Sequence, residues 1–194
     1  EDMALTGWQD WYAEVDRELH ALRRRCAAVF VVGLSMGGAL ALRLAAKHGE
    51  GVAGVVVVNP ANKVHGLSAY ALPVARHLVR TTKGIASDIA KGGVEESGYD
   101  RVPLPSAHSL RTFLRLVDGE LPQVTQPLLV LRSARDHVVP AADTARVLSR
   151  VSSTDVTDIV LEQSNTWATL DHDAERISYH SLAFNGRHTT AIGI

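Results

Sequence analysis

One short motif in the sequence combines residue types that could carry out covalent catalysis. Residues 33–37 read Gly33-Leu34-Ser35-Met36-Gly37, the pattern G-x-S-x-G, whose glycines allow a sharp turn that side chains would obstruct. A serine at such a turn can attack a carbonyl carbon, and the backbone N–H of Met36, at a helix start, can donate to the resulting oxyanion. An incidental serine in a glycine-rich turn is the alternative. A buried strand before the motif and a buried helix after it favour Ser35 as nucleophile and Met36 N–H in the oxyanion hole.

A serine hydroxyl is not deprotonated alone at neutral pH, so Ser35 requires a histidine base and a carboxylate that orients this base. With this type of turn, the chain order is serine, acid, histidine. Asp136 is the candidate acid, because it lies in the loop 133–140, just after a predicted strand over Leu128–Arg132. Catalytic groups gather at the C-terminal ends of parallel strands. A solvated loop aspartate without a role is the alternative.

A framework of alternating strands and helices must position these residues, and the hydrophobic pattern predicts one. Continuous apolar runs rich in β-branched residues are typical of strands covered on both faces, as in a parallel sheet. Apolar residues at helical spacing, preceded in the first case by a capping box at Thr6, indicate the helices. The predicted strands are Ala27–Val32, Val55–Val58, Leu128–Arg132 and Thr157–Leu161; one predicted helix begins near Trp8 and the others are Ala39–His48, Ala141–Arg150 and Asp173–Phe184.

The order of these elements predicts a single α/β domain with an insertion. At 194 residues, the chain is long enough to bury one substantial core. Strand and helix alternate over residues 1–60 and again over residues 123–194, which predicts the core of the domain. Residues 61–122 contain moderately amphipathic stretches interrupted by proline and glycine, and we predict an inserted helical lid there.

The motif around Ser35 and the sequence Ser133-x-x-Asp136-x-Val138-Val139-Pro140 resemble the bacterial carboxylesterase and monoacylglycerol lipase group of the α/β-hydrolase superfamily. The similarity extends over nearly the whole chain, including the helix near Trp8 and the lid segment 61–122. The resemblance implies the α/β-hydrolase fold, a mostly parallel sheet with flanking helices and a small helical lid. It also implies hydrolysis of short-chain acyl esters or monoglycerides through an acyl-serine, without a cofactor.

One departure from the family's pattern concerns the general base. In the family, the base histidine lies in a small polar loop after the strand that follows the acid, shortly before a Leu-Asp pair. Counting from Ser164 and from Leu170-Asp171 in the matching loop places Thr166 at the histidine position. Threonine cannot accept and return a proton near pH 7, so the predicted triad lacks its base.

Other histidines are weaker candidates for this base. His172 lies six residues beyond the expected position, where it is expected to face solvent or to cap the final helix. His137 adjoins Asp136 in the sequence and is not expected to turn back onto it. His180 and His188 belong to the final helix or its end, and we expect them on the surface.

A second departure concerns the start of the chain. The family places several strands before the helix at Trp8, and a His-Gly loop after one of them supplies another oxyanion-hole amide; this chain contains neither. We therefore expect the fold to lack its N-terminal strands, and the absence of an initial methionine predicts an incomplete N-terminus. The strand before Ser35 would then have an open edge, which favours pairing between chains into a homo-oligomer.

Composition argues against several other classes of function. Twenty basic residues oppose 21 acidic residues, without the basic stripe expected of a protein that binds nucleic acid or an anionic membrane surface. No apolar run approaches the roughly 20 residues that span a bilayer, and no signal peptide is visible, so we expect a cytoplasmic location. Cys26 is the only cysteine and is expected to be buried. His137, His172 and His188 lack metal-ligand spacing, so no metal site is predicted.

Two hypotheses about function follow from these observations. The first is a serine carboxylesterase or lipase of small acyl esters, in which Ser35 attacks, Met36 N–H helps to hold the oxyanion and Asp136 orients a base, with activity impaired by Thr166. The second is a non-catalytic α/β-hydrolase-like protein that binds an apolar ligand or a partner in the same pocket. Acyl transfer to an acceptor other than water would use the same residues.

Overall fold

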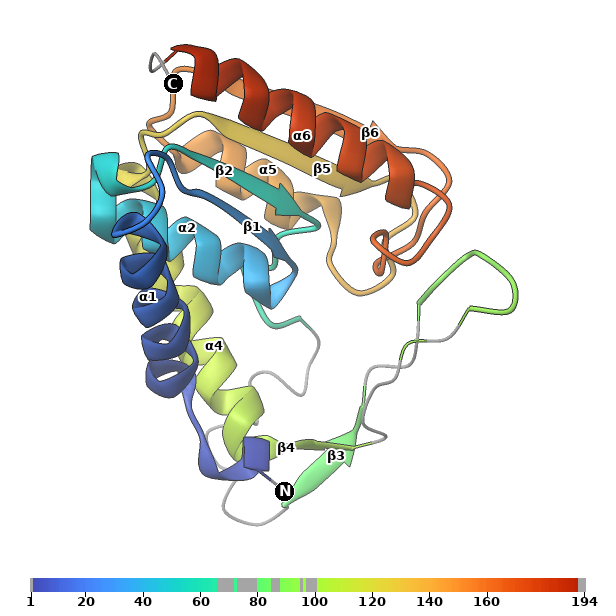
Figure 1. Cartoon of the computed structure of the whole chain (residues 1–194). Helices are drawn as coiled ribbons and strands as arrows, with labels where there is room; N and C mark the ends of the chain where they lie inside the picture. Colours follow the sequence, from blue (N-terminus) through green and yellow to red (C-terminus); the bar gives the residue numbers. More distant parts are fainter. Residues whose placement is uncertain are drawn as a thin grey trace.

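A four-stranded parallel sheet forms the centre of the computed structural model, which describes residues 2–65, 72, 80–84, 88–94, 96 and 101–191. The strands lie in the order β1-β2-β5-β6, and each neighbouring pair is parallel. Parallel strands need crossover connections, and each of the three connections between these strands contains a described α-helix (Figure 1). The strands are β1 (Phe30–Leu34), β2 (Gly54–Val58), β5 (Leu128–Ser133) and β6 (Val156–Leu161).

Both faces of the sheet are covered at β2, in which every residue is buried. Alternate side chains of a strand point to opposite faces. Val55 and Val57 join an apolar cluster with the helix that follows β1, whereas Val56 and Val58 join a second cluster with the C-terminal helix. Burial on both sides explains why the β-branched run is continuous rather than alternating.

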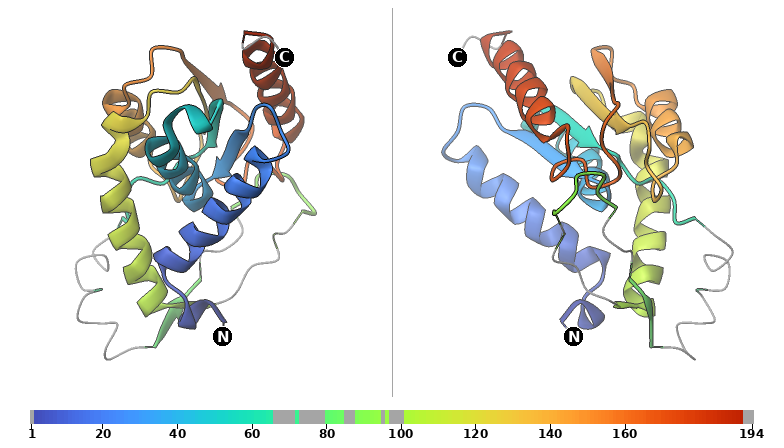
Figure 2. Two further views of the ribbon diagram at one scale, coloured as in Figure 1. Left: turned by 60° about the vertical axis from the view of Figure 1, so that its left-hand side comes forward. Right: turned by 90° about the vertical axis from the view of Figure 1, so that its right-hand side faces the viewer.

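The helices form two layers around the sheet (Figures 1 and 2). Four of them contribute to the first cluster: α1 (Trp8–Arg23), α2 (Met36–His48), α4 (Leu104–Glu120) and α5 (Ala141–Arg150). On the opposite face, α6 (Ala174–Ala191) packs against β2 and β5 through residues such as Ile177 and Phe184. The other elements that residues 2–65, 80–84 and 101–191 form are short: the antiparallel pair β3 (Thr81–Lys83) and β4 (Arg101–Pro103), and the 3-10 turns η1 (Asp2–Leu5), η2 (Gly49–Gly51) and η3 (Leu121–Gln123).

The predicted strands are all present, with small shifts at their ends. The largest shift is at β1, which begins at Phe30 instead of Ala27 and ends at Leu34. The prediction that Cys26 is buried was wrong: Cys26 is exposed, because it lies in the turn that follows α1 and not in the strand. The backbone N–H of Cys26 donates to Leu22 O at 2.8 Å in that turn.

The capping of α1 also differs from the prediction. The helix begins at Trp8, and Gly7 is its N-cap residue instead of Thr6. The carboxylate of Asp10 in the first turn accepts the backbone N–H of Gly7 at 2.8 Å. The hydroxyl of Thr6 accepts the indole N–H of Trp11 at 3.0 Å. An acidic residue in the first turn therefore stabilises the helix start, with the charge sign that the helix dipole favours.

The strand that precedes Ser35 lies at one edge of the sheet, as predicted. Among the described residues, β1 pairs only with β2, and Val32 on β1 is 58% exposed. An apolar groove runs along this edge between α1, β1 and α2, and Leu19, Val31 and Leu40 are among the residues that line it. Pairing of two chains through this edge stays a prediction.

The C-terminal part of segment 61–122 packs on the main domain. It forms α4, whose Phe113, Leu114 and Val117 are buried in the same cluster as α2 and β2. Trp8 of α1 stacks on Phe113 with 5.7 Å between the ring centroids. Most of the earlier half of the segment lies outside the described residues, as do Leu67 and Tyr70. The division into a core and a lid therefore stays a prediction.

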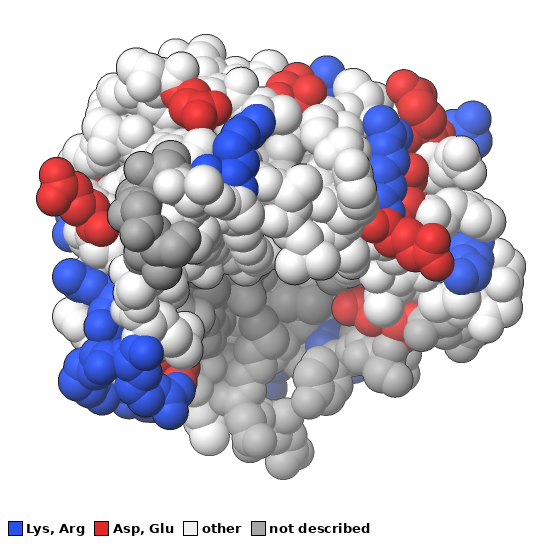
Figure 3. Space-filling model, turned by 45° about the horizontal axis from the view of Figure 1, so that its top comes forward, with Lys and Arg blue, Asp and Glu red and all other residues white. Residues whose placement is uncertain are grey.

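No helix in the described parts of the chain is both long and apolar enough to cross a bilayer. On the face shown in Figure 3, acidic and basic side chains are scattered among other residues, with one local group of basic side chains. This mixed pattern agrees with the near balance of 20 basic and 21 acidic residues.

Candidate active site

Ser35 occupies a strained turn between β1 and α2. Its φ of 52° and ψ of −113° place it outside the conformations that a serine ordinarily adopts. The surrounding backbone holds this geometry, because Ser35 N–H donates to Val58 O at 3.0 Å, and Ser35 O accepts from Ala39 N and Ala61 N. The hydroxyl does not cap α2. Strain that neighbouring hydrogen bonds maintain is typical of functional sites.

The two glycines of the motif have different structural roles. A Cβ on Gly33 would lie 2.1 Å from Gly37 O, so a side chain at position 33 cannot be accommodated. A Cβ on Gly37 would have no neighbour within 4 Å, which contradicts the prediction that a side chain there would obstruct the turn. The second close approach is instead at Gly38, where a Cβ would lie 3.3 Å from Pro60. The turn therefore requires glycine at its start and favours it at Gly38.

Met36 is the first residue of α2, directly after Ser35. The first four N–H groups of an α-helix have no acceptor within the helix, and they point along its axis past the N-terminus. The free N–H groups at the half-buried N-terminus of α2 therefore stabilise a negative charge that develops beside Ser35. The role of Met36 N–H in an oxyanion hole stays a prediction, supported by this position.

Asp136 lies in the loop after β5, and Ser35 follows β1, so both lie at the C-terminal end of the parallel strands, toward which the strand arrows point in Figure 1. Its Oδ1 accepts the backbone N–H groups of Val138 at 2.9 Å and Val139 at 2.7 Å, which orients the carboxylate. Its Oδ2 is buried and accepts no hydrogen bond from the described part of the chain. An unsatisfied buried carboxylate oxygen is costly, and an imidazole N–H is the type of donor that would satisfy it.

Thr166 lies directly beside this carboxylate, at the position expected for the base. Its hydroxyl is within hydrogen-bonding distance of Asp136 Oδ1, and the residue is only 1% exposed. Two acidic residues hold the surrounding loop: Asp171 accepts the N–H of Asn165, and Asp173 accepts the hydroxyl of Ser164. That Thr166 stands at the position of the base histidine stays a prediction, supported by its contact with Asp136.

Asp88 is a site residue that the sequence did not indicate. Its carboxylate accepts the Thr166 hydroxyl at 2.6 Å and backbone N–H at 3.1 Å, as well as the side-chain amide of Asn165. Burial opposes the charge of Asp88, but hydrogen bonds from Thr166 and His137 outweigh this effect and lower its pKa. A threonine hydroxyl carries one proton, so Thr166 can donate to only one of its two carboxylate neighbours at a time.

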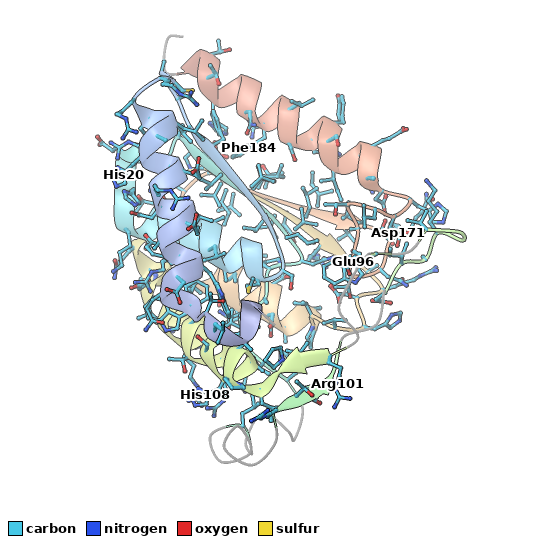
Figure 4. All side chains as sticks on the ribbon, turned by 60° about the horizontal axis from the view of Figure 1, so that its bottom comes forward. His20, Glu96, Arg101, His108, Asp171 and Phe184 are labelled. Carbon is cyan, nitrogen blue, oxygen red and sulfur yellow. The ribbon has the colours of Figure 1, made fainter. Side chains whose placement is uncertain are left out.

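The segment that carries Asp88 is also anchored next to the site through Asp171 (Figure 4). The carboxylate of Asp171 accepts the backbone N–H of Ala90 at 2.8 Å and of Lys91 at 2.9 Å. Burial raises the pKa of Asp171, but these bonds and those from Asn165 and His172 lower it below the usual value. No local sequence pattern could have shown this contact, since Ala90 and Asp171 are 81 residues apart.

None of the described histidines bonds to Asp136. His137 Nδ1 lies 2.8 Å from Asp88 Oδ1, and this hydrogen bond and the charge of Asp88 raise the pKa of His137. His172 is exposed, as predicted, and its N–H donates to Asp171. His188 was expected on the surface, but only 11% of its side chain is exposed, because it packs against Phe184.

Asn59 connects the strands beneath the site. It follows β2 with a φ of 43° and is 2% exposed. Its side-chain amide donates to Ser133 Oγ at 3.0 Å and to Thr166 O at 2.9 Å, while its carbonyl accepts Ser133 N–H at 2.7 Å. The sequence indicated Asn59-Pro60 only as the end of a strand. This side chain joins β2, β5 and the loop after β6, and so positions Thr166 relative to the sheet.

Comparison with known proteins gives the family. The family model described as serine aminopeptidase, S33 matches residues 1–164. A thermostable monoacylglycerol lipase from Bacillus sp. (strain H-257) is 34% identical over 188 residues, which cover 97% of this chain and 74% of the relative. The chain belongs to this family of α/β-hydrolases. Its own segment of strand, turn and helix at Ser35 is the family's expected arrangement.

Solved structures agree with this membership. A structure from the work on LipS and LipT, two metagenome-derived lipolytic enzymes, matches this α/β-hydrolase with a TM-score of 0.92 and 35% identity, covering 96% of this chain and 76% of that chain. The monoacylglycerol lipase of Paleococcus ferrophilus, at 17% identity and a TM-score of 0.69, shares the fold over 95% of this chain and 76% of its own. By lineage, the chain is a carboxylic ester hydrolase.

Proposed function

We propose that this α/β-hydrolase has the machinery of a serine esterase for short-chain acyl esters or monoglycerides, and that Thr166 holds its turnover low. One observation carries the proposal: the Thr166 hydroxyl is bonded to Asp136, the carboxylate that should orient a histidine. The substrate class rests on the similarity to a monoacylglycerol lipase. The strained turn at Ser35 supports its role as the nucleophile.

The proposed reaction has two steps that each need a proton acceptor. Ser35 Oγ bonds to the ester carbonyl carbon while its proton passes to solvent water, and Met36 N–H donates to the oxyanion. The bond from this carbon to the alcohol oxygen then breaks, and the alcohol leaves with a proton from solvent. Water attacks the acyl-Ser35 and must lose a proton in the same way. Thr166 can relay a hydrogen bond to Asp136 but cannot accept a proton at neutral pH.

The expected impairment is large. Removal of the histidine from a serine protease triad lowers kcat about 2 × 10⁶-fold, and the residual acceleration of about 10³–10⁴ over water comes from binding and the oxyanion hole. The intact turn at Ser35 and the N-terminus of α2 would supply only that residual part here. A non-catalytic binding protein is the second candidate, favoured by the position of the Thr166 hydroxyl within hydrogen-bonding distance of both Asp88 and Asp136, where the family has a base.

Hydrolysis of p-nitrophenyl butyrate distinguishes the two candidates. The full chain is compared with Ser35→Ala, Thr166→His and Thr166→Asn, the last being a polar control that cannot act as a base. Thr166 is buried against Asp88, so the larger imidazole needs space. The double variant Thr166→His with Asp88→Ala provides this space, and thermal unfolding checks that each variant is folded.

We expect Thr166→His, alone or with Asp88→Ala, to raise kcat about 10²–10⁴-fold, the usual contribution of a general base. Thr166→Asn should give no gain, and Ser35→Ala should abolish the gain from histidine. Full activity of the unaltered chain that depends on Ser35 would refute the limiting role of Thr166. Folded but inactive histidine variants would favour the binding protein.

A further inference from the structure

Three side chains with metal-binding atoms converge where α1 runs beside the C-terminal end of α2. Asp16 and His20 are four residues apart on α1 and so lie on one face of the helix, and His48 is the last residue of α2. Asp16 Oδ1 is 2.6 Å from His48 Nε2, and Asp16 Oδ2 is 3.7 Å from His20 Nε2. Within the described ranges, theirs is the group whose ligand atoms all lie within 4.8 Å of one another.

We propose that Asp16, His20 and His48 bind a zinc ion. Two imidazole nitrogens and one carboxylate oxygen are a donor set that Zn²⁺ prefers, with a fourth tetrahedral position left for water. Zinc–ligand bonds of about 2.0–2.1 Å place tetrahedral ligand atoms about 3.3 Å apart. Asp16 presents a different oxygen to each histidine, at 2.6 Å from His48 Nε2 and 3.7 Å from His20 Nε2. One ligand atom from each of the three residues already lies within 4.8 Å of the other two, so small side-chain rotations would bring them to the zinc spacing.

The surroundings suit a cation at this position. The C-terminal end of α2, where His48 lies, carries the negative end of the helix dipole. The nearby cation Arg43, which lies over the Tyr12 ring, is opposed by Glu120 at 3.5 Å.

An ion can reach the cluster from solvent. The side chain of His20 is 52% exposed, that of Asp16 is 30% exposed and that of His48 is 13% exposed. Figure 4 labels His20 on the outer helix α1. The two histidine rings already meet edge to face, with 5.1 Å between their centroids. Exposure of His20 allows access, while the partial burial of His48 limits the motion of the site.

The proposed ion would stabilise the fold without taking part in ester chemistry. It would join α1 to the end of α2 that is opposite to Ser35. A helix of 13 residues is about 20 Å long, which separates the ion from the nucleophile. The sequence did not indicate the cluster, because His48 follows His20 by 28 positions and only packing of the two helices brings them together.

The test uses the full, untagged chain after treatment with a chelator. Titration with Co²⁺ is followed by the absorption bands of tetrahedral cobalt in the visible range, and titration with Zn²⁺ by calorimetry and by thermal unfolding. The variants Asp16→Asn, His20→Gln and His48→Gln are compared with His180→Gln, a control histidine on α6. Because the His20 side chain is half-exposed, lies 3.7 Å from Asp16 and otherwise meets the His48 ring only edge to face among the described residues, His20→Gln should keep the fold.

We expect one Zn²⁺ per chain and a higher Tm in its presence. Loss of a residue that hydrogen-bonds to a metal ligand typically weakens metal binding about 10–100-fold. Loss of a ligand itself should therefore weaken Zn²⁺ binding at least tenfold in each of the three variants. His180→Gln should bind as the unaltered chain does. Absence of the cobalt bands, or equal Zn²⁺ affinity in His20→Gln and the unaltered chain, would overturn the proposal.

Discussion

Substitution of Gly33 by alanine should disrupt the turn that presents Ser35, whereas the same change at Gly37 should be tolerated. The new methyl group at position 33 would lie 2.1 Å from the carbonyl oxygen and 2.3 Å from the carbonyl carbon of Gly37, and 2.5 Å from Gly38 N. These neighbours are backbone atoms of α2, so no side-chain rotation can relieve the overlap. The helix would have to shift by more than about 1 Å relative to β1, with an ordinary contact taken as about 3.5 Å.

The magnitude follows from this overlap. Extra methylene groups in well-packed cores typically cost about 1–3 kcal/mol when neighbouring side chains can adjust. Here the backbone must move, so we expect the free energy of unfolding to fall by at least about 3 kcal/mol for Gly33→Ala. At Gly37, no atom lies within 4 Å and the residue is helical, so alanine should raise stability by roughly 0.5–1 kcal/mol.

Equilibrium unfolding in urea, followed by far-ultraviolet circular dichroism, measures the change in the free energy of unfolding for both variants. In the Thr166→His background, which supplies a base for Ser35, reaction with a fluorophosphonate probe reports whether the turn still presents the hydroxyl; adding Gly37→Ala should preserve the reaction and adding Gly33→Ala should abolish it. A Gly33→Ala variant within about 0.5 kcal/mol of the unaltered chain would refute the steric argument, since surface substitutions typically stay within that range. Equal damage from both substitutions would refute the distinction between the two glycines.

Three further predictions concern the site. Asp171→Asn should lower stability by about 1.5–3 kcal/mol at pH 7, measured by urea unfolding, because a carboxylate accepts its backbone N–H bonds. The pKa of Asp171 is lower in the folded chain than in the unfolded chain, where it is about 4, so this stabilisation is present above pH 4 and is lost as the pH falls through the pKa of the folded state. The free energies of unfolding of the variant and the unaltered chain should therefore become equal in acid. Ser35→Gly should raise Tm, with a gain of about 1 kcal/mol, because glycine adopts the positive φ of 52° without strain; Ser35→Ala, which keeps the strain, is the matched control. Asn59→Gly should lower the free energy of unfolding by about 2 kcal/mol through lost hydrogen bonds alone, since glycine tolerates the φ of 43°; an unchanged value would show that these bonds contribute nothing.

Local patterns were sufficient to predict the parallel sheet and the turn at Ser35. Each strand was visible because side chains two residues apart share a face, and continuous apolar runs such as Val55–Val58 indicate burial on both faces. The choice of Asp136 as the acid followed from the chain order that this type of turn implies and from its position just after a predicted strand. The position of Thr166 followed from counting along one loop, which needs no knowledge of distant contacts.

The failures of prediction arose where the outcome depends on distant parts of the chain. The prediction that Cys26 is buried assumed that the strand began before Phe30, but pairing with β2 sets the strand's start. The prediction for Gly37 assumed that both motif glycines face a close neighbour, whereas the path of α2 leaves that side open. Such details depend on the angle at which a helix leaves the sheet, which the types of neighbouring residues do not specify.

The sequence by itself determined the class of fold, the nucleophile candidate and the threonine at the position of the base, because these depend on periodicity and on spacing within short segments. Only the tertiary structure decided which groups surround them. Asp88 reaches Thr166 across 78 positions, and His48 reaches Asp16 across 32. Contacts at such separations are set by how whole helices and loops pack, since burial of apolar faces selects the packing and the polar groups between them must then find partners.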